Sequence, residues 1–327
     1  MSSDSLDRTI PTPPGGISYP KDAAPSIIFA VAFAALLPVV YLRQTSPATR
    51  TTVTVLTSIT VLQRVILHSL RAAQALHEPI RFSVGLLAYI DASLAYGSLF
   101  MLRDALAIFR CSLVHYTNPP DLIDPYHDTV CDTTRGVSDP RRRQRIRWIL
   151  TAVDFVLLGL LVPSTLQAVW FPRAVVVEEM TRTVMIARFV VGGGYVILVS
   201  GFAIGFYATR KTQWAESEVA KSKLNSLVSL MLMNAGYRLA NTLRVVPDLH
   251  STGRGSNQSP LDKVFFYICW CFAEWGFAAT ILFSRTRIEY RTGAWGDWRL
   301  FDEQQPPWML LNWTSRRRMM NSSVELQ

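Results

Sequence analysis

Seven stretches of this chain are long and apolar enough to cross a lipid bilayer, and several carry a charge in mid-span. A spanning helix needs about 20 apolar residues, and an ionised side chain inside a membrane is costly. The sequence therefore predicts an all-α polytopic membrane protein, a seven-helix bundle with polar groups hidden inside it. The predicted spans cover residues 23–42, 51–70, 82–108, 148–171, 183–207, 224–243 and 264–283.

The positions of lysine and arginine predict the orientation of this bundle. If the N-terminus lies outside, the cytoplasmic segments hold 20 basic residues and the outer segments hold nine. Short basic connections stay on the cytoplasmic side. We therefore expect an outer N-terminus and a cytoplasmic C-terminus. As a separate expectation, we place the protein in the plasma membrane rather than in an endomembrane. This asymmetry also explains most of the net charge of +9, so no nucleic-acid partner is needed.

Composition divides the chain into three regions. Residues 1–22 are polar and rich in proline, so we expect a disordered outer tail. They lack the apolar core of a cleavable signal peptide, which leaves the first span as the insertion signal. Residues 23–285 form the membrane domain, and residues 286–327 are expected to be a mostly disordered cytoplasmic tail.

Polar residues inside the spans are the candidate ligand-binding groups. Arg64 and His68 share one face of the second span, and Asn234 and Arg238 share one face of the sixth, since each pair is four residues apart. Opposite charges at one depth should pair, because an unpaired ion in the membrane is expensive. We expect Arg64 to pair with Glu274 or Asp91. The full candidate set is Arg64, His68, Asp91, Arg188, Asn234, Arg238 and Glu274.

Three interpretations of these buried charges remain open. They can hold the helices together, they can line a polar pocket that opens outward, or they can form a proton or ion path. A path would need acidic groups in both halves of the membrane. Only Asp154 is expected in the inner half, which disfavours the path.

The long connection between the third and fourth spans carries two further motifs. A basic run abuts the fourth span and is expected to contact anionic lipid, with docking of a cytoplasmic effector as the alternative; it comprises Arg141, Arg142, Arg143, Arg145 and Arg147. The second motif, Cys111, His115, His127 and Cys131, has the ligand types of tetrahedral zinc. Its spacing matches no standard finger, so coincidence is favoured and no metal or other cofactor is expected.

Enzyme signatures are missing from the sequence. It contains no P-loop, no His-Glu-x-x-His and no Gly-x-Ser-x-Gly, so we expect no enzymatic activity. Arg64 to Arg71, Asp91 and Arg103, the run at 265–268 and Glu274 together resemble a family of fungal seven-span membrane proteins known only as a domain of unknown function.

That resemblance implies a fungal source and a seven-helix core, and it supplies no catalytic residues. More distantly, the layout is similar to fungal receptor-like seven-span proteins and to lipid-translocating exporters. The leading hypothesis is a receptor-like protein that senses a small ligand in an outer-half polar pocket, with membrane lipids and a cytoplasmic effector as partners. A lipid or small-molecule exporter is the alternative, followed by a purely structural membrane protein.

Overall fold

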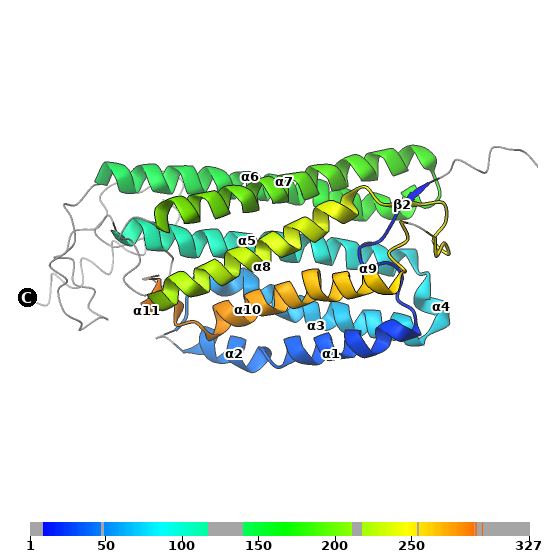
Figure 1. Cartoon of the computed structure of the whole chain (residues 1–327), viewed down its shortest axis with the longest axis horizontal. Helices are drawn as coiled ribbons and strands as arrows, with labels where there is room; N and C mark the ends of the chain where they lie inside the picture. Colours follow the sequence, from blue (N-terminus) through cyan, green and yellow to red (C-terminus); the bar gives the residue numbers. More distant parts are fainter. Residues whose placement is uncertain are drawn as a thin grey trace, which may run out of the picture.

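The long helices of the computed structural model run side by side along one axis (Figure 1). The structure describes residues 9–46, 49–116, 140–210, 218–253 and 255–290, together with residues 292 and 296. Two short strands lie at one end of the bundle and helix α11 lies at the other. We call these the strand end and the α11 end.

Helices dominate the described part of the chain. The N-terminal half contains β1 (Ile10–Pro11), η2 (Pro20–Asp22), α1 (Ala23–Ala34), α2 (Leu37–Thr45), η3 (Thr52–Thr54), α3 (Val55–Leu76), α4 (Glu78–Arg81) and α5 (Val84–Tyr116). The C-terminal half contains α6 (Pro140–Ala174), α7 (Glu178–Arg210), α8 (Glu218–Thr242), β2 (Val245–Val246), α9 (Pro260–Phe265), η4 (Phe266–Phe272), α10 (Ala273–Phe283) and α11 (Thr286–Glu289).

Six described helical segments are long and apolar enough to cross a membrane. They cover residues 20–45, 52–76, 84–114, 141–174, 178–209 and 260–283. This architecture is that of an all-α polytopic membrane protein. Helix α8, which contains most of the sixth predicted span, is not among the six. Its three inward polar residues, Asn234, Arg238 and Asn241, lower its mean hydropathy.

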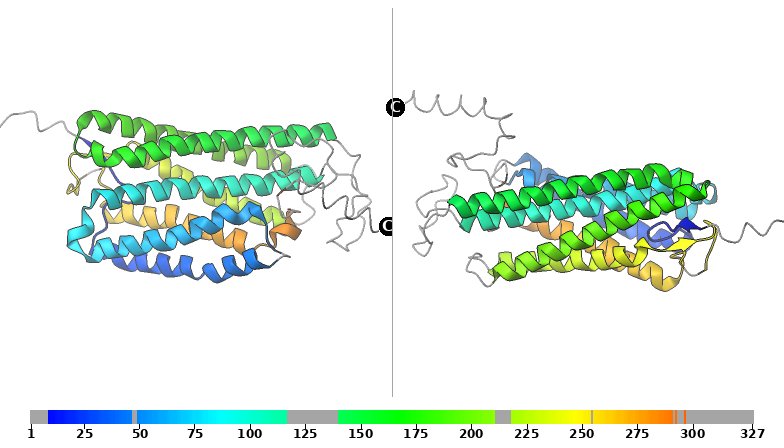
Figure 2. Two further views of the ribbon diagram at one scale, coloured as in Figure 1. Left: turned by 180° about the vertical axis from the view of Figure 1, so that it is seen from behind. Right: turned by 90° about the horizontal axis from the view of Figure 1, so that it is seen from above.

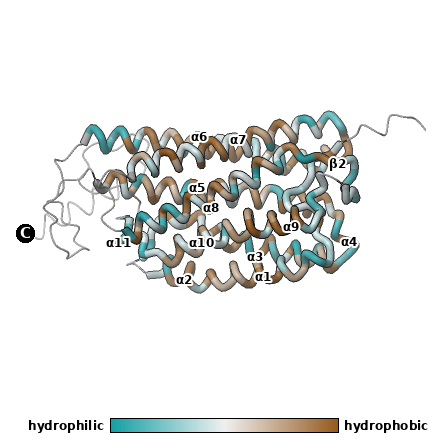
Figure 3. Tube along the Cα trace, viewed as in Figure 1, coloured by the Kyte–Doolittle hydropathy of each residue, from teal (hydrophilic) through white to brown (hydrophobic). Residues whose placement is uncertain are grey.

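The exterior of the bundle is apolar where a bilayer would surround it. Large side chains such as Phe155, Ile186, Ile197, Ile204 and Ile268 are exposed. Hydrophobic residues fill the central parts of the helices, and hydrophilic residues gather toward the two ends (Figure 3). A water-soluble fold would bury such side chains, so this pattern fits a lipid environment.

Two predicted spans are interrupted. The first divides at Ala35 and Leu36, and α2 then begins with Leu37 and Pro38; the missing N–H of Pro38 prevents a continuous helical ladder. The last predicted span divides into α9, the π-helical η4 and α10. A π-turn inserts an extra residue into the helix, and such turns are common at functional sites. Here it lies beside Glu274.

The N-terminal segment differs from the expected disordered tail. Ile10 pairs with Val246 in a two-stranded antiparallel sheet, and Thr12, Ile17 and Ser18 are buried at the strand end. Figure 2 shows β1 and β2 together at that end of the molecule. We call residues 9–19 the N-terminal segment. Residues 1–8 of the predicted tail lie outside the described residues, as does most of the predicted cytoplasmic tail.

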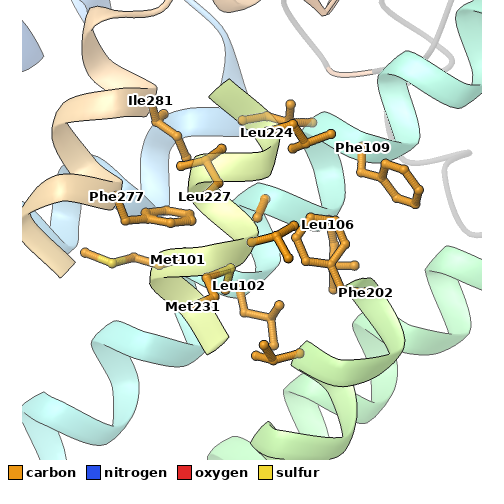
Figure 4. Close-up of a cluster of buried hydrophobic side chains, with 14 of the residues drawn as sticks. Met101, Leu102, Leu106, Phe109, Phe202, Leu224, Leu227, Met231, Phe277 and Ile281 are labelled. Carbon is orange, nitrogen blue, oxygen red and sulfur yellow. The ribbon is translucent and has the colours of Figure 1, made fainter. Parts of the chain in front are cut away.

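An apolar core fills the half of the bundle nearer to α11. Figure 4 shows side chains from α5, α7, α8 and α10 meeting there. The labelled members include Met101, Leu106, Phe202, Leu227 and Phe277, all buried. Most buried side chains in this half of the bundle are apolar.

Candidate functional site

Arg64 of α3 and Glu274 of α10 form a buried, two-pronged ion pair. The Nε–Oε2 distance is 2.5 Å and the Nη2–Oε1 distance is 2.8 Å. The side chain of Arg64 is 0% exposed and that of Glu274 is 3% exposed. Of the two partners expected for Arg64, the structure shows Glu274 and not Asp91.

Neighbouring groups complete the hydrogen bonding of this pair. Ser98 Oγ and Trp270 Nε1 both donate to Glu274 Oε1, at 3.0 and 2.9 Å. Arg64 Nη1 donates to the carbonyl oxygen of Ser93 at 2.9 Å. Gly97 provides the space, because a Cβ at this position would overlap the guanidinium of Arg64. A buried pair needs such extra bonds to offset the lost hydration of two ions.

Asp91 of α5 pairs with Arg188 of α7 and not with Arg64. The Oδ2–Nη2 distance is 2.9 Å, and Gln167 Nε2 of α6 donates to the same carboxylate oxygen at 2.5 Å. Arg188 Nη1 also donates to the carbonyl oxygen of Thr12 at 2.6 Å. This cluster thus joins three helices to the N-terminal segment.

Arg238 of α8 has a different environment from the other two arginines. It is 7% exposed, and its buried Nη1 atom has no hydrogen-bond partner. No carboxylate in the described part of the chain forms an ion pair with it. The guanidinium carbon lies 5.2 Å from the ring centre of Tyr195 and 6.0 Å from that of Trp270.

Aromatic rings alone do not balance this buried charge. A cation–π contact contributes about 0.5–2 kcal/mol, whereas burying an ion costs several kcal/mol even after relaxation. An arginine keeps its proton in nearly all protein environments. Arg238 therefore leaves a positive charge near the middle of the site that the described side chains only partly offset.

A small cavity of about 30 Å³ lies beside Arg238. Such a volume holds roughly two water molecules, since one needs about 10–15 Å³. Three residues of the predicted set, Asp91, Arg188 and Arg238, contribute to its wall. The full lining is Pro14, Asp91, Ala95, Gln167, Arg188, Arg238, Asn241, Thr242 and Trp270.

Asn234 and His68 lie elsewhere. Asn234 shares a cavity of about 10 Å³ with Glu274 and Ser98, and both atoms of its side-chain amide are buried without a partner. His68 lines neither cavity. Its ring is stacked near Phe29 and Phe33, with centres 5.5 and 5.7 Å away, and neither ring nitrogen has a partner.

The N-terminal segment closes the strand end through its backbone carbonyl groups. Lys263 Nζ donates to the carbonyl oxygens of Gly15 and Ile17, at 3.0 and 2.7 Å, and pairs with Asp22 at 2.8 Å. Arg71 Nη2 donates to the same Gly15 oxygen at 3.3 Å. These cations were not assigned to a tail contact from the sequence. The sequence signal for these contacts is the pair Gly15-Gly16, because adjacent glycines allow a tight turn toward the bundle. Both glycines have positive φ in the structure.

Gln167 and Trp270 are also members of the site that sequence reasoning missed. Neither carries a charge, and each occurs within a predicted span, so neither stands out. Trp270 belongs to η4, where the π-turn changes which side chains face inward. Its position beside both Glu274 and Arg238 could not be read from a regular helical period.

Polar groups near the α11 end are more numerous than expected. Asp154 pairs with Arg110 at 3.3 Å, and Asp104 is 1% exposed. Asp104 Oδ2 accepts from the backbone N–H of Thr57 at 2.7 Å, at the start of α3. A carboxylate at a helix N-terminus is favourable because free N–H groups point at it.

The basic run forms the first turns of α6. Arg141, Arg142 and Arg145 are exposed, whereas Arg143 and Arg147 are buried. The exposed Arg141 and Arg145 are available to lipid or to a partner.

For the zinc hypothesis, Cys111 is buried on α5 and His115 lies in the same helix, while His127 and Cys131 fall outside the described residues. Within the described ranges, no group of three or more metal-ligating side chains comes together.

No family model, curated protein or solved structure matches this chain.

Proposed function

We propose that this chain is a receptor-like seven-helix membrane protein that senses a small ligand through the polar pocket near the strand end. The observation that carries the proposal is Arg238, a buried cation without a carboxylate partner among the described residues, which lines a cavity beside the Asp91–Arg188 pair. A purely structural network would balance its charges within itself. The incompletely balanced charge favours a ligand.

The N-terminal segment gives this pocket a means of responding. Pro14 lines the cavity, and Arg188 donates to both the Thr12 carbonyl oxygen and Asp91. A ligand larger than the cavity would displace the segment and disturb the Asp91–Arg188–Gln167 cluster. Helix α6 carries Gln167 and also the exposed Arg141 and Arg145, roughly 33 Å and more away at 1.5 Å per residue. Movement of α6 would therefore reach the surface proposed for an effector.

We count α8 as a membrane span in addition to the six that length and hydropathy identify, which gives seven in all. Its inward face carries Asn234 and Arg238, while Leu232 and Leu239 are exposed. The exposed Ser226 and Ser229 donate to carbonyl oxygens of their own helix, at 3.1 and 3.0 Å, so they tolerate lipid. With seven spans the termini lie on opposite sides. The counts of basic residues favour an outer strand end and a cytoplasmic α11 end.

A lipid or small-molecule exporter is the second candidate. Asp104 and the Arg110–Asp154 pair favour it, because an exporter needs polar groups along both halves of the membrane. Asp104 lies on α5 among buried members of the apolar core of Figure 4, such as Met101 and Leu106. An exporter would have to open that core, whereas a receptor would not.

A deletion strain can separate the two candidates. We expect loss of the gene to alter the transcriptional response to an external small molecule, found in a growth screen, while efflux of a fluorescent dye stays unchanged. The variant Arg141→Gln with Arg145→Gln should impair the response and still reach the plasma membrane. The matched control, Arg173→Gln with Arg182→Gln, removes two exposed arginines from the opposite end.

The contrary result is an energy-dependent efflux defect in the deletion strain that the Arg141→Gln, Arg145→Gln variant fully restores. That outcome would replace the receptor with the exporter.

A further inference from the structure

The lining of the cavity beside Arg238 carries an excess of one positive charge. It contains two guanidinium groups, from Arg188 and Arg238, and one carboxylate, from Asp91. Arg188 is engaged by Asp91 and by the Thr12 carbonyl oxygen. The charge left without a carboxylate partner belongs to Arg238, whose Nη1 atom is buried.

Shape and polarity restrict what can balance this charge. The cavity is about 30 Å³, too small for a drug-sized ligand, whose pockets measure about 300–1,000 Å³. Asn241 Oδ1, on the next turn of α8, is buried without a partner and can accept a hydrogen bond. A small anion on Arg238, with one bridging water donating to Asn241, would satisfy both groups.

We infer that the cavity between Arg238, Arg188 and Asp91 binds a small monovalent anion, of the size of chloride or formate. This inference deepens the proposed function, because it names the chemical class that the pocket takes while the N-terminal segment is closed. A divalent anion is disfavoured, since its second charge would face Asp91 without a matching cation.

The test uses the purified full chain in detergent micelles. Its thermal midpoint is followed while sodium gluconate is replaced by sodium chloride or by sodium formate at constant ionic strength. Because a ligand that binds only the folded state stabilises it by mass action, the midpoint should rise and then saturate. Stronger stabilisation by formate would assign a carboxylate ligand, and stronger stabilisation by chloride a halide.

Three variants locate the effect. Arg238→Gln should weaken the apparent affinity at least tenfold, and Ala95→Val should do the same by filling the cavity while every charge stays. The matched control Arg182→Gln removes an exposed arginine from α7, six residues before Arg188, and should behave as the parent. If Arg238→Gln does not fold, Ala95→Val still decides the outcome.

Line broadening of the ³⁵Cl nuclear magnetic resonance signal by the parent protein gives a direct measurement that needs no variant. Saturable broadening that formate reverses supports the inference. Absence of any saturable anion effect in the parent overturns it, as does an equal effect in Arg238→Gln and Arg182→Gln. A negative result here with an intact cellular response would remove the anion and leave the receptor proposal standing.

Discussion

Glu274 accepts hydrogen bonds from three side chains, and one of them is a fully buried arginine. Arg64, in turn, reaches Glu274 only because Gly97 leaves room for it. Each of the two ions is tolerable in the bundle because the other is present. Removing one is therefore far more damaging than removing both.

We predict that Glu274→Gln lowers the free energy of unfolding by about 3–5 kcal/mol, because Arg64 is left without its counter-ion. The double variant Arg64→Met, Glu274→Gln should return to within about 1 kcal/mol of the parent, since a buried pair can be replaced by apolar groups at little cost. Thermal unfolding in detergent measures both. The exposed Glu179→Gln serves as control. If Glu274→Gln unfolds like that control, the pair does not stabilise the bundle.

His68 is buried with two nitrogen atoms that bond to nothing. A buried polar group without a partner costs about 1–3 kcal/mol, and Phe29 and Phe33 already stack near the ring. We therefore expect His68→Phe to be at least as stable as the parent. His77→Phe makes the same change at an exposed position and should bring no gain. A marked loss of stability in His68→Phe would indicate that the imidazole has a polar partner.

At the scale of elements, the N-terminal segment depends on the conformation of Gly15. Its φ is +69°, and a Cβ there would lie 2.7 Å from ring atoms of Phe266. Residues other than glycine rarely adopt this backbone conformation, because it costs them about 1–2 kcal/mol. The turn places the Gly15 carbonyl oxygen where Arg71 and Lys263 donate to it.

We predict that Gly15→Ala loosens the N-terminal segment without unfolding the helices. Amide hydrogen exchange of residues 10–18 should accelerate at least tenfold, while exchange within α5 and α7 stays unchanged. Gly193→Ala is the matched control, because a Cβ at that helical position meets no atom within 4 Å. Equal exchange in the two variants would show that the turn does not hold the segment closed.

Some of these elements and contacts could be predicted from the sequence, and others could not. Apolar length predicted six of the long helical segments, and the depth of the charges limited the expected partner of Arg64 to Glu274 or Asp91. The N-terminal segment was missed because its stability comes from backbone carbonyl groups, which composition does not reveal. The Asp91–Arg188 pair was missed because equal depth cannot select between partners on neighbouring helices. The π-turn at η4 was missed because it breaks the period on which helical faces are assigned.

For the molecule as a whole, the status of α8 decides the topology. If α8 spans the membrane, the two termini lie on opposite sides, whereas six spans would put them on the same side. We predict an accessible N-terminal tag and an inaccessible C-terminal tag on intact cells, with both accessible after permeabilisation. A known two-sided marker protein in the same cells controls for leakage. Accessibility of both tags before permeabilisation would exclude α8 as a span.

The strand pairing has a consequence for how the molecule is made. Thr12 donates to the carbonyl oxygen of Gly255, a residue 243 positions later in the chain, and β1 needs β2 as its partner. Because β2 and Gly255 follow α8 in the chain, residues 10–12 can reach this arrangement only after α1 to α8 have been synthesised. The strand end is therefore closed by a segment that precedes every described helix in the chain. A bulky fusion placed next to Ile10 would hinder this late step while leaving insertion of the helices intact.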